Sequence, residues 1–179
     1  LFITPMWNEA ITPHDAKVCN YFVDDWKKQG HDVVVVHYRS AFPTIYIKVA
    51  KMFPTIGKRV CGDQCYVNDA AREVQYDYNG SVVYSIPIRK YIPHGSFGKT
   101  ALDEQAVSLV KMLKQLDFQP DAIIGHFCNP TLGIINRLQS VFSKARTAVV
   151  LHETPSTIER IYKNEGEKVL NSVDAIGFR

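Results

Sequence analysis

Three histidines follow segments that read as buried strands, each beside a turn that leads into a helix. They are His14, His126 and His152. An imidazole exchanges protons near neutral pH and binds sugar hydroxyls, so these residues suit acid–base work or recognition of a hydroxyl-rich ligand. A single histidine at a strand end is more often a packed or capping residue. Three on one predicted edge favour a site, and we expect at least one of them to be functional.

The three turns that carry these histidines share one design. In each, a strand is followed by polar residues, a capping residue and a proline at what reads as the first helical position. The pairs are Thr12-Pro13, Asn129-Pro130 and Thr154-Pro155. Proline suits that position because its missing N–H would have had no partner there, and the start of a helix attracts anions. Asn129, Glu153 and Thr154 add donors and acceptors for a hydroxyl-rich ligand.

Parallel strands are needed to bring these turns to one edge, and the sequence predicts them. Short, continuously apolar runs alternate with stretches of helical periodicity. One such stretch has Val18, Tyr21, Phe22 and Trp26 at helical spacing and ends at Gly30. The predicted strands read LFITP, HDVVVVHY, DAIIGHF, TAVVL and DAIGF, and later predicted helices cover 100–118, 130–143 and 165–172. The pattern predicts an α/β fold, a Rossmann-like three-layer sandwich with a mostly parallel sheet.

The middle of the chain departs from this alternation. REVQYDYNGSVVYSIPI has two β-rich runs joined by Asn79-Gly80. Asparagine and glycine tolerate the positive φ angles of a two-residue turn, so we expect a β-hairpin insertion near residues 72–88.

Length, charge and absent motifs narrow the function. The 179 residues, with a net charge of +3, predict a single domain over 1–179 and no nucleic-acid binding. The chain shows no leader-like segment and no apolar run of about 18 residues, which favours a cytoplasmic location. GxGxxG, P-loop and G-x-S-x-G motifs are absent from the sequence, against dinucleotide, ATPase and hydrolase chemistry. Cys61 and Cys65 lack the spacing and further ligands of a zinc site, so we expect no metal.

Residues 43–60 read as an amphipathic helix. Ile45, Val49 and Met52 form one apolar stripe, which we expect to pack on the sheet. The apolar surface is wider than one stripe, however, and Lys48 flanks it. The other nearby basic residues are Lys51, Lys58 and Arg59. A wide apolar face with flanking lysines is also typical of a helix that lies on a membrane surface, so that alternative stays open.

Several segments resemble one enzyme family in its own order. LFITP followed by a loop, a long helix and QGHDVVVV is similar to the opening of GT-B retaining glycosyltransferases of the group 1 superfamily. PDAIIGHFCNPTLG resembles that family's strand and histidine-bearing turn. TAVVLHETP resembles its strand ending in histidine, and NSVDAIGF resembles a strand near the end of the same domain.

The resemblance implies the amino-terminal, acceptor-side half of a two-domain enzyme that takes a sugar from a nucleotide-sugar donor without a bound metal or other cofactor. His152 matches the family histidine that faces the reacting sugars, and His126 matches one on the same edge. The first loop departs from the family's glycine, but backbone groups from Thr12 to His14 remain candidates for substrate contact. The family's carboxyl-terminal half carries a glutamate pair in an E-x7-E arrangement, and no such pair occurs here in the matching context. We therefore expect that half to be absent and the chain alone to be inactive.

The acceptor implied by the resemblance is a glycan or a lipid-linked glycan, in cell-surface polysaccharide biosynthesis. Some members of the family use lipid-linked acceptors. For this chain the resemblance therefore implies contact with the inner face of the plasma membrane through 43–60. The alternative is a non-catalytic module of the same fold that binds a glycan or a protein partner.

Overall fold

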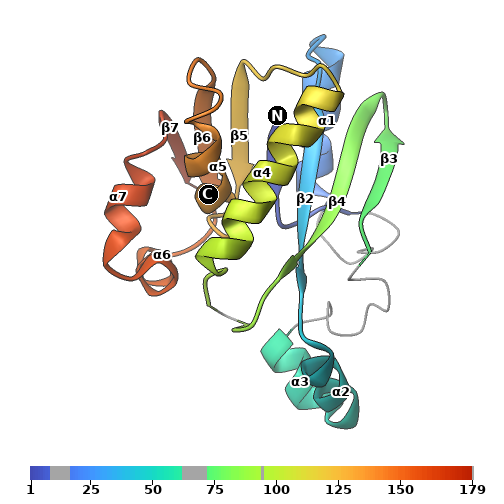
Figure 1. The fold of residues 1–179 in the computed structure, drawn as a ribbon, viewed down its shortest axis with the longest axis vertical. Coiled ribbons are helices and arrows are strands. Elements are labelled where there is room, and N and C mark those ends of the chain that lie inside the picture. Colours follow the sequence, from blue (N-terminus) through green and yellow to red (C-terminus); the bar gives the residue numbers. More distant parts are fainter. Residues whose placement is uncertain (9–16, 62–71, 94, 179) are drawn as a thin grey trace. The chain divides into compact units, whose positions relative to one another are not determined.

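The computed structural model describes residues 1–8, 17–61, 72–93 and 95–178, which form an α/β protein with mostly parallel strands (Figure 1). The expected Rossmann-like fold class is confirmed. The single domain over 1–179 stays a prediction, and the two compact units into which the chain divides are described separately. The first contains Leu1–Pro5 and Ser96–Arg179, and the second contains Met6–Gly95.

The first unit has a parallel set of strands in the order β1-β5-β6-β7. Three of the strands, β1, β5 and β6, are short, mainly apolar and mostly buried or half-buried, as the sequence predicts for strands covered on both faces, whereas β7 is mostly exposed. The strands are β1 (Phe2–Thr4), β5 (Ala122–His126), β6 (Arg146–Leu151) and β7 (Ala175–Phe178). The helices are α4 (Lys99–Gln115), α5 (Thr131–Leu138), α6 (Pro155–Tyr162) and α7 (Gly166–Leu170), with the 3-10 turn η2 (Lys163–Glu165) between the last two.

An apolar cluster beneath α5 and α6 fixes the carboxyl ends of β5 and β6. Its buried members are Cys128, Leu132, Val149, Leu151, Ile158 and Ile161. Burying each larger aliphatic side chain of this kind stabilises the fold by about 1.5–3 kcal/mol. The cluster therefore holds the adjacent turns in place. The helix predicted over 130–143 is shorter in the structure, because α5 ends at Leu138 and turns follow it.

The second unit has the strand order β3-β4-β2, in which β4 runs parallel to β2 and antiparallel to β3. Asn79 and Gly80 have φ angles of 51° and 76° between β3 and β4, so the predicted hairpin is confirmed. The elements are α1 (Val18–Lys28), β2 (Val34–Ala41), α2 (Thr44–Met52), α3 (Pro54–Cys61), β3 (Val74–Tyr78) and β4 (Ser81–Arg89).

The helix α1 ends where the sequence predicts, because Gly30 has the positive φ of 87° that follows many helices. Its buried side chains are Cys19, Asn20 and Val23, whereas Tyr21 of the expected stripe is exposed. Periodicity showed an amphipathic helix but placed its buried face about one position away.

The expectation that 43–60 packs on the sheet is wrong. The segment forms two short helices, α2 and α3, that pack against each other. Ile45, Val49 and Met52, the predicted packing stripe, are all exposed, whereas the small Ala50 is buried. Within the described residues, no helix has the length and apolar character needed to cross a bilayer.

Candidate functional site

The carboxyl ends of β5 and β6 bring two of the predicted histidines together. His126 is the last residue of β5, and His152 directly follows β6. Parallel pairing places His126 opposite Val150, so the two histidines leave neighbouring strands at nearly the same level. Their Nε2 atoms are 2.8 Å apart, and the ring centroids are 4.5 Å apart.

This contact allows only one proton between the two rings. One Nε2 donates and the other accepts, so the accepting imidazole must carry its proton on Nδ1 when it is neutral. His126 is fully buried, whereas His152 is half-buried. Among the described residues, Nδ1 of His152 has no hydrogen-bond partner. The pair can therefore hold and pass a proton, with His152 as its outer member.

An aromatic side chain fixes the outer imidazole. The Phe127 ring stacks on His152 at a centroid distance of 4.6 Å and an interplanar angle of 27°. Phe127 has a φ of 65°, an uncommon backbone conformation for a large side chain. Such residues often lie at ligand sites, where the surrounding packing holds them in place.

Glu153 ties the two strand ends together. Its Oε1 accepts from the backbone N–H of Cys128 at 2.9 Å, and its Oε2 accepts from that of His152 at 3.1 Å. Hydrogen bonds to an ionised acceptor are stronger than neutral ones. We expected Glu153 to contact substrate; in this structure both carboxylate oxygens position the turns that carry the histidines.

A glycine lets α5 sit close to β5. A Cβ on Gly125 would lie 2.2 Å from Thr131 Cγ2 and 2.8 Å from Ile135 Cδ1. The Thr131 hydroxyl uses this proximity to donate to the carbonyl of His126 at 3.2 Å. The start of the helix is thus fastened to the inner histidine.

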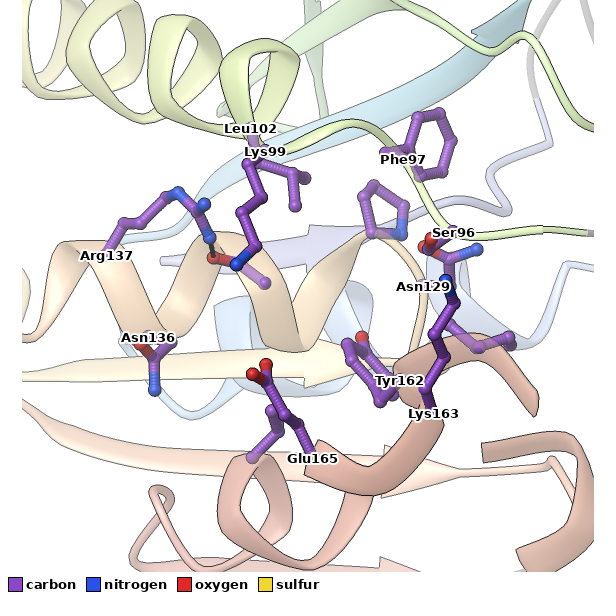
Figure 2. Close-up of a pocket in the computed structure, with 14 residues that line it drawn as sticks. Ser96, Phe97, Lys99, Leu102, Asn129, Asn136, Arg137, Tyr162, Lys163 and Glu165 are labelled. Atoms are coloured by element: carbon purple, nitrogen blue, oxygen red, sulfur yellow. Dashed lines mark hydrogen bonds between the residues drawn. The ribbon is translucent and has the colours of Figure 1, made fainter. Parts of the chain in front are cut away.

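A cavity of about 620 Å³ opens in the first unit beside this turn (Figure 2). Asn129 and Pro130, two and three residues after the positive-φ Phe127, form part of its wall. Residues of α4, α5, α6, η2 and α7 complete it. The other lining residues are Ser96, Phe97, Lys99, Leu102, Gly133, Asn136, Arg137, Ile161, Tyr162, Lys163, Glu165 and Val169.

The cavity wall carries more basic than acidic side chains. Arg137 is engaged, because Nε donates to Asp103 at 2.5 Å and Nη1 donates to the carbonyl of Gly133 at 2.8 Å. Lys99 and Lys163 are exposed, and neither has an ion pair among the described residues. Figure 2 shows Lys99 beside Arg137, and Lys163 on the side of Tyr162 and Asn129. Two available ammonium groups suit an anionic or hydroxyl-rich ligand.

Tyr162 joins the cavity to the histidine turn. Its hydroxyl donates to the backbone carbonyl of Cys128 at 2.5 Å. Burial raises the pKa of this phenol far above its ordinary range, and the neighbouring Cys128 and Glu153 add to the effect. Tyr162 therefore stays protonated and acts as a fixed donor rather than as a base.

The predicted site residues fall into three groups. His126, His152 and Glu153 lie together at the ends of β5 and β6, and Asn129, in the turn after β5, lines the cavity. Thr154 caps α6, because Oγ1 accepts from the N–H of Thr157 at 3.4 Å. The remaining two predicted residues, Thr12 and His14, lie outside the described residues.

The expected cap by Asn129 is wrong. Pro130 itself holds the N-cap position of α5, with no side-chain cap bond, and Asn129 lines the cavity instead. Lys99, Tyr162 and Lys163 were missed by the sequence analysis. No local pattern marks them, because they come from elements that are distant in the sequence.

The side chains of two cysteines are described, Cys19 and Cys128; both are buried and neither forms a disulfide with another described residue. In the described ranges, no group of three or more histidine, cysteine, aspartate or glutamate side chains is placed to hold a metal ion. The expected absence of a zinc site at Cys61 and Cys65 concerns Cys65 and the side chain of Cys61, which lie outside the described residues.

Comparison with known proteins gives no direct identification. The chain matches no known protein-family model, and no curated protein is significantly similar to it.

Proposed function

We propose that this chain is the acceptor-side half of a glycosyltransferase that uses a nucleotide-sugar donor. The observation that carries the proposal is the paired imidazoles of His126 and His152, held at the carboxyl end of parallel strands beside a polar cavity. Open α/β sheets bind ligands at this edge. The sequence resemblance given above points to the same chemistry for the same two histidines.

The cavity suits an acceptor sugar in size and lining. A volume of about 620 Å³ lies in the usual range of small-ligand sites, which is about 300–1,000 Å³. Amide groups of Asn129 and Asn136 offer donors and acceptors for hydroxyls, and the phenyl ring of Phe97 offers an apolar surface. Lys99 and Lys163 favour an acceptor that carries a phosphate or carboxylate.

In this proposal His152 contacts the reacting sugars and His126 is a positioning residue. His152 is half-buried and its Nε2 is fixed by His126, so its Nδ1 is the nitrogen that we assign to the ligand. A hydrogen bond from a fixed imidazole orients a sugar hydroxyl or stabilises charge as the donor's diphosphate leaves. The donor itself is held mostly by a second half, as in the resembling family. The product would serve cell-surface polysaccharide synthesis.

A transferase assay on the protein expressed from the whole gene tests the proposal. The protein is incubated with UDP-, GDP- and dTDP-sugars and a set of mono- and oligosaccharide acceptors, and released nucleoside diphosphate and product mass are measured. We expect turnover with one donor class, and none from the 179-residue chain alone. Turnover by the chain alone would contradict the division into two halves.

The same assay tests the role of the cavity. Lys99→Ala and Lys163→Ala should raise KM for the acceptor and leave KM for the donor nearly unchanged. Lys111→Ala, an exposed lysine on α4 outside the cavity, is the matched control. Saturable glycan binding without any turnover by the whole-gene protein would instead identify a binding module of the same fold.

A further inference from the structure

The pair α2–α3 exposes an apolar surface that is large for two short helices. Seven of the thirteen exposed large apolar side chains in the described residues lie within this one segment. Ile45, Val49 and Met52 share one side of α2 by their helical spacing, and Ile56 and Val60 share one side of α3. The exposed fractions of the seven run from 37% to 71%. We call them the α2–α3 face; they are Ile45, Tyr46, Val49, Met52, Phe53, Ile56 and Val60.

The helix pair cannot bury these side chains by itself. Among its described side chains, the buried positions are Ala50 and Gly57, and both residues are small. A proline at the first position of α3 separates the helices directly after Phe53. In Figure 1, α2 and α3 lie beyond the carboxyl end of β2 rather than on the face of the β2–β4 strands. Contiguous exposed apolar side chains of this kind mark an interaction surface.

The charged residues of α2 and α3 indicate which kind of partner the α2–α3 face binds. Lys48, Lys51 and Arg59 are exposed on the same two helices, and the sequence from Thr44 to Cys61 has no aspartate or glutamate. An apolar face flanked only by positive charge matches a bilayer with anionic headgroups, which offers both hydrocarbon and negative charge. Two copies pairing through this face would bring like charges together, which disfavours a symmetric dimer.

We infer that the α2–α3 face docks on an anionic lipid surface. The two helices lie along the interface, with the apolar side chains inserted by about 5–10 Å and the basic groups among the headgroups. Neither helix needs to cross the bilayer for this. The inference rests on α2 and α3 alone and holds whatever reaction the chain serves. In a transferase it would favour acceptors attached to lipid.

Vesicle flotation tests the inference on the 179-residue chain and on the whole-gene protein. The probes are vesicles of phosphatidylcholine alone and of phosphatidylcholine with phosphatidylglycerol. We expect binding only to the anionic vesicles, with loss of binding as salt is raised. The double change Lys48→Glu and Lys51→Glu should lower the partition coefficient by about thirty-fold or more, since each basic residue near such a surface contributes several-fold.

Matched changes on α4 control for net charge and surface apolarity. Lys111→Glu with Lys114→Glu makes the same charge change on exposed lysines outside the face and should weaken binding much less. Met52→Ser should weaken binding, whereas Val107→Ser should not, although both side chains are exposed to nearly the same extent. Circular dichroism on each variant shows whether it is folded.

Insertion gives a second readout. Met52→Trp should shift its emission to the blue with anionic vesicles and be quenched by brominated lipid, and Val107→Trp should do neither. No binding to anionic vesicles at low salt by either protein overturns the inference. A dimer that is lost on Met52→Ser, with no vesicle binding, overturns it in favour of a second copy. Salt-dependent binding without the Met52→Trp shift overturns the inserted arrangement.

Discussion

Nε2 of His126 lies 2.8 Å from Nε2 of His152, and only the second ring reaches the surface. The two histidines should therefore respond differently to removal. His126→Ala empties a buried position and should cost about 2–4 kcal/mol of unfolding free energy. His152→Ala leaves one buried nitrogen without its partner and should cost about 1–2 kcal/mol, while the proposed transferase turnover of the whole-gene protein should fall far more than that loss explains. Urea unfolding and the transferase assay measure both.

His31→Ala, at an exposed position before β2, is the control and should change neither quantity. If His152→Ala lowered stability as much as His126→Ala and left turnover unchanged, both histidines would be structural. That result would contradict the proposed contact of His152 with the sugars.

Glu153 should contribute to stability through its two backbone hydrogen bonds. Glu153→Ala leaves the N–H groups of Cys128 and His152 without their acceptor and should lower the unfolding free energy by about 2 kcal/mol. The unfolding free energy of Glu153→Gln should lie between those of the parent and Glu153→Ala. The glutamine keeps one acceptor oxygen, but its NH2 group faces a backbone N–H donor. Glu104→Ala, on the exposed side of α4, is the comparison. Equal stability of the Glu153 and Glu104 variants would contradict this role.

Gly125 should not tolerate a side chain. Gly125→Ala places a methyl 2.2 Å from Thr131 Cγ2, and the resulting shift of α5 should cost about 1–3 kcal/mol. Gly177→Ala, in β7, is the matched control, because its nearest side-chain atom would be 3.7 Å away. Adding Thr131→Ser removes the clashing methyl and keeps the hydroxyl, so the double variant should recover part of the loss. Thermal unfolding of the four proteins checks this.

Local chemistry explains which parts of the fold were predictable. The Asn79-Gly80 turn and the Thr154 cap each depend on a few adjacent residues, so the sequence was enough to predict them. Continuous apolar runs likewise predicted parallel strands, and parallel strands brought His126 and His152 to one edge.

Other features depend on packing that periodicity does not describe. Helical spacing showed that α2 is amphipathic, but it could not show whether anything covers the apolar face. The cavity could not be predicted from the sequence for a related reason. Lys99 and Lys163 line one cavity because the start of α4 and the end of α6 both border it, a relationship that no spacing rule contains.

Stability should fall in acid partly through Asp174. Its Oδ2 accepts from the N–H and the hydroxyl of Thr147 at 2.7 Å and 3.0 Å, and these bonds, with a smaller effect of Arg146, hold the pKa below its ordinary value of 3.8. A lowered pKa in the folded state means that the contribution is complete above the unfolded value and is lost as pH falls through the folded value.

Asp174→Asn removes that contribution, so the variant should be less stable than the parent near neutral pH. The difference should shrink as pH falls from about 5 to about 2. Urea unfolding at several pH values measures it, with Glu104→Gln as the control for loss of a carboxylate. A difference that stays constant over this range would show that the Thr147 bonds do not depend on the charge of Asp174.

Lys163 should lower the stability of the fold through a strained backbone, while its ammonium group supplies a positive charge to the cavity. It connects α6 to η2 with φ 54° and ψ −133°, a region that glycine adopts readily and other residues rarely do. Lys163→Gly should therefore raise the unfolding free energy by about 1 kcal/mol, because the strain is relieved. Lys163→Ala keeps the strain and should change stability little. Both variants lose the ammonium group, so in the proposed transferase reaction of the whole-gene protein both should raise KM for the acceptor to the same extent. If the glycine variant were no more stable than the alanine variant, the backbone at Lys163 would not be strained.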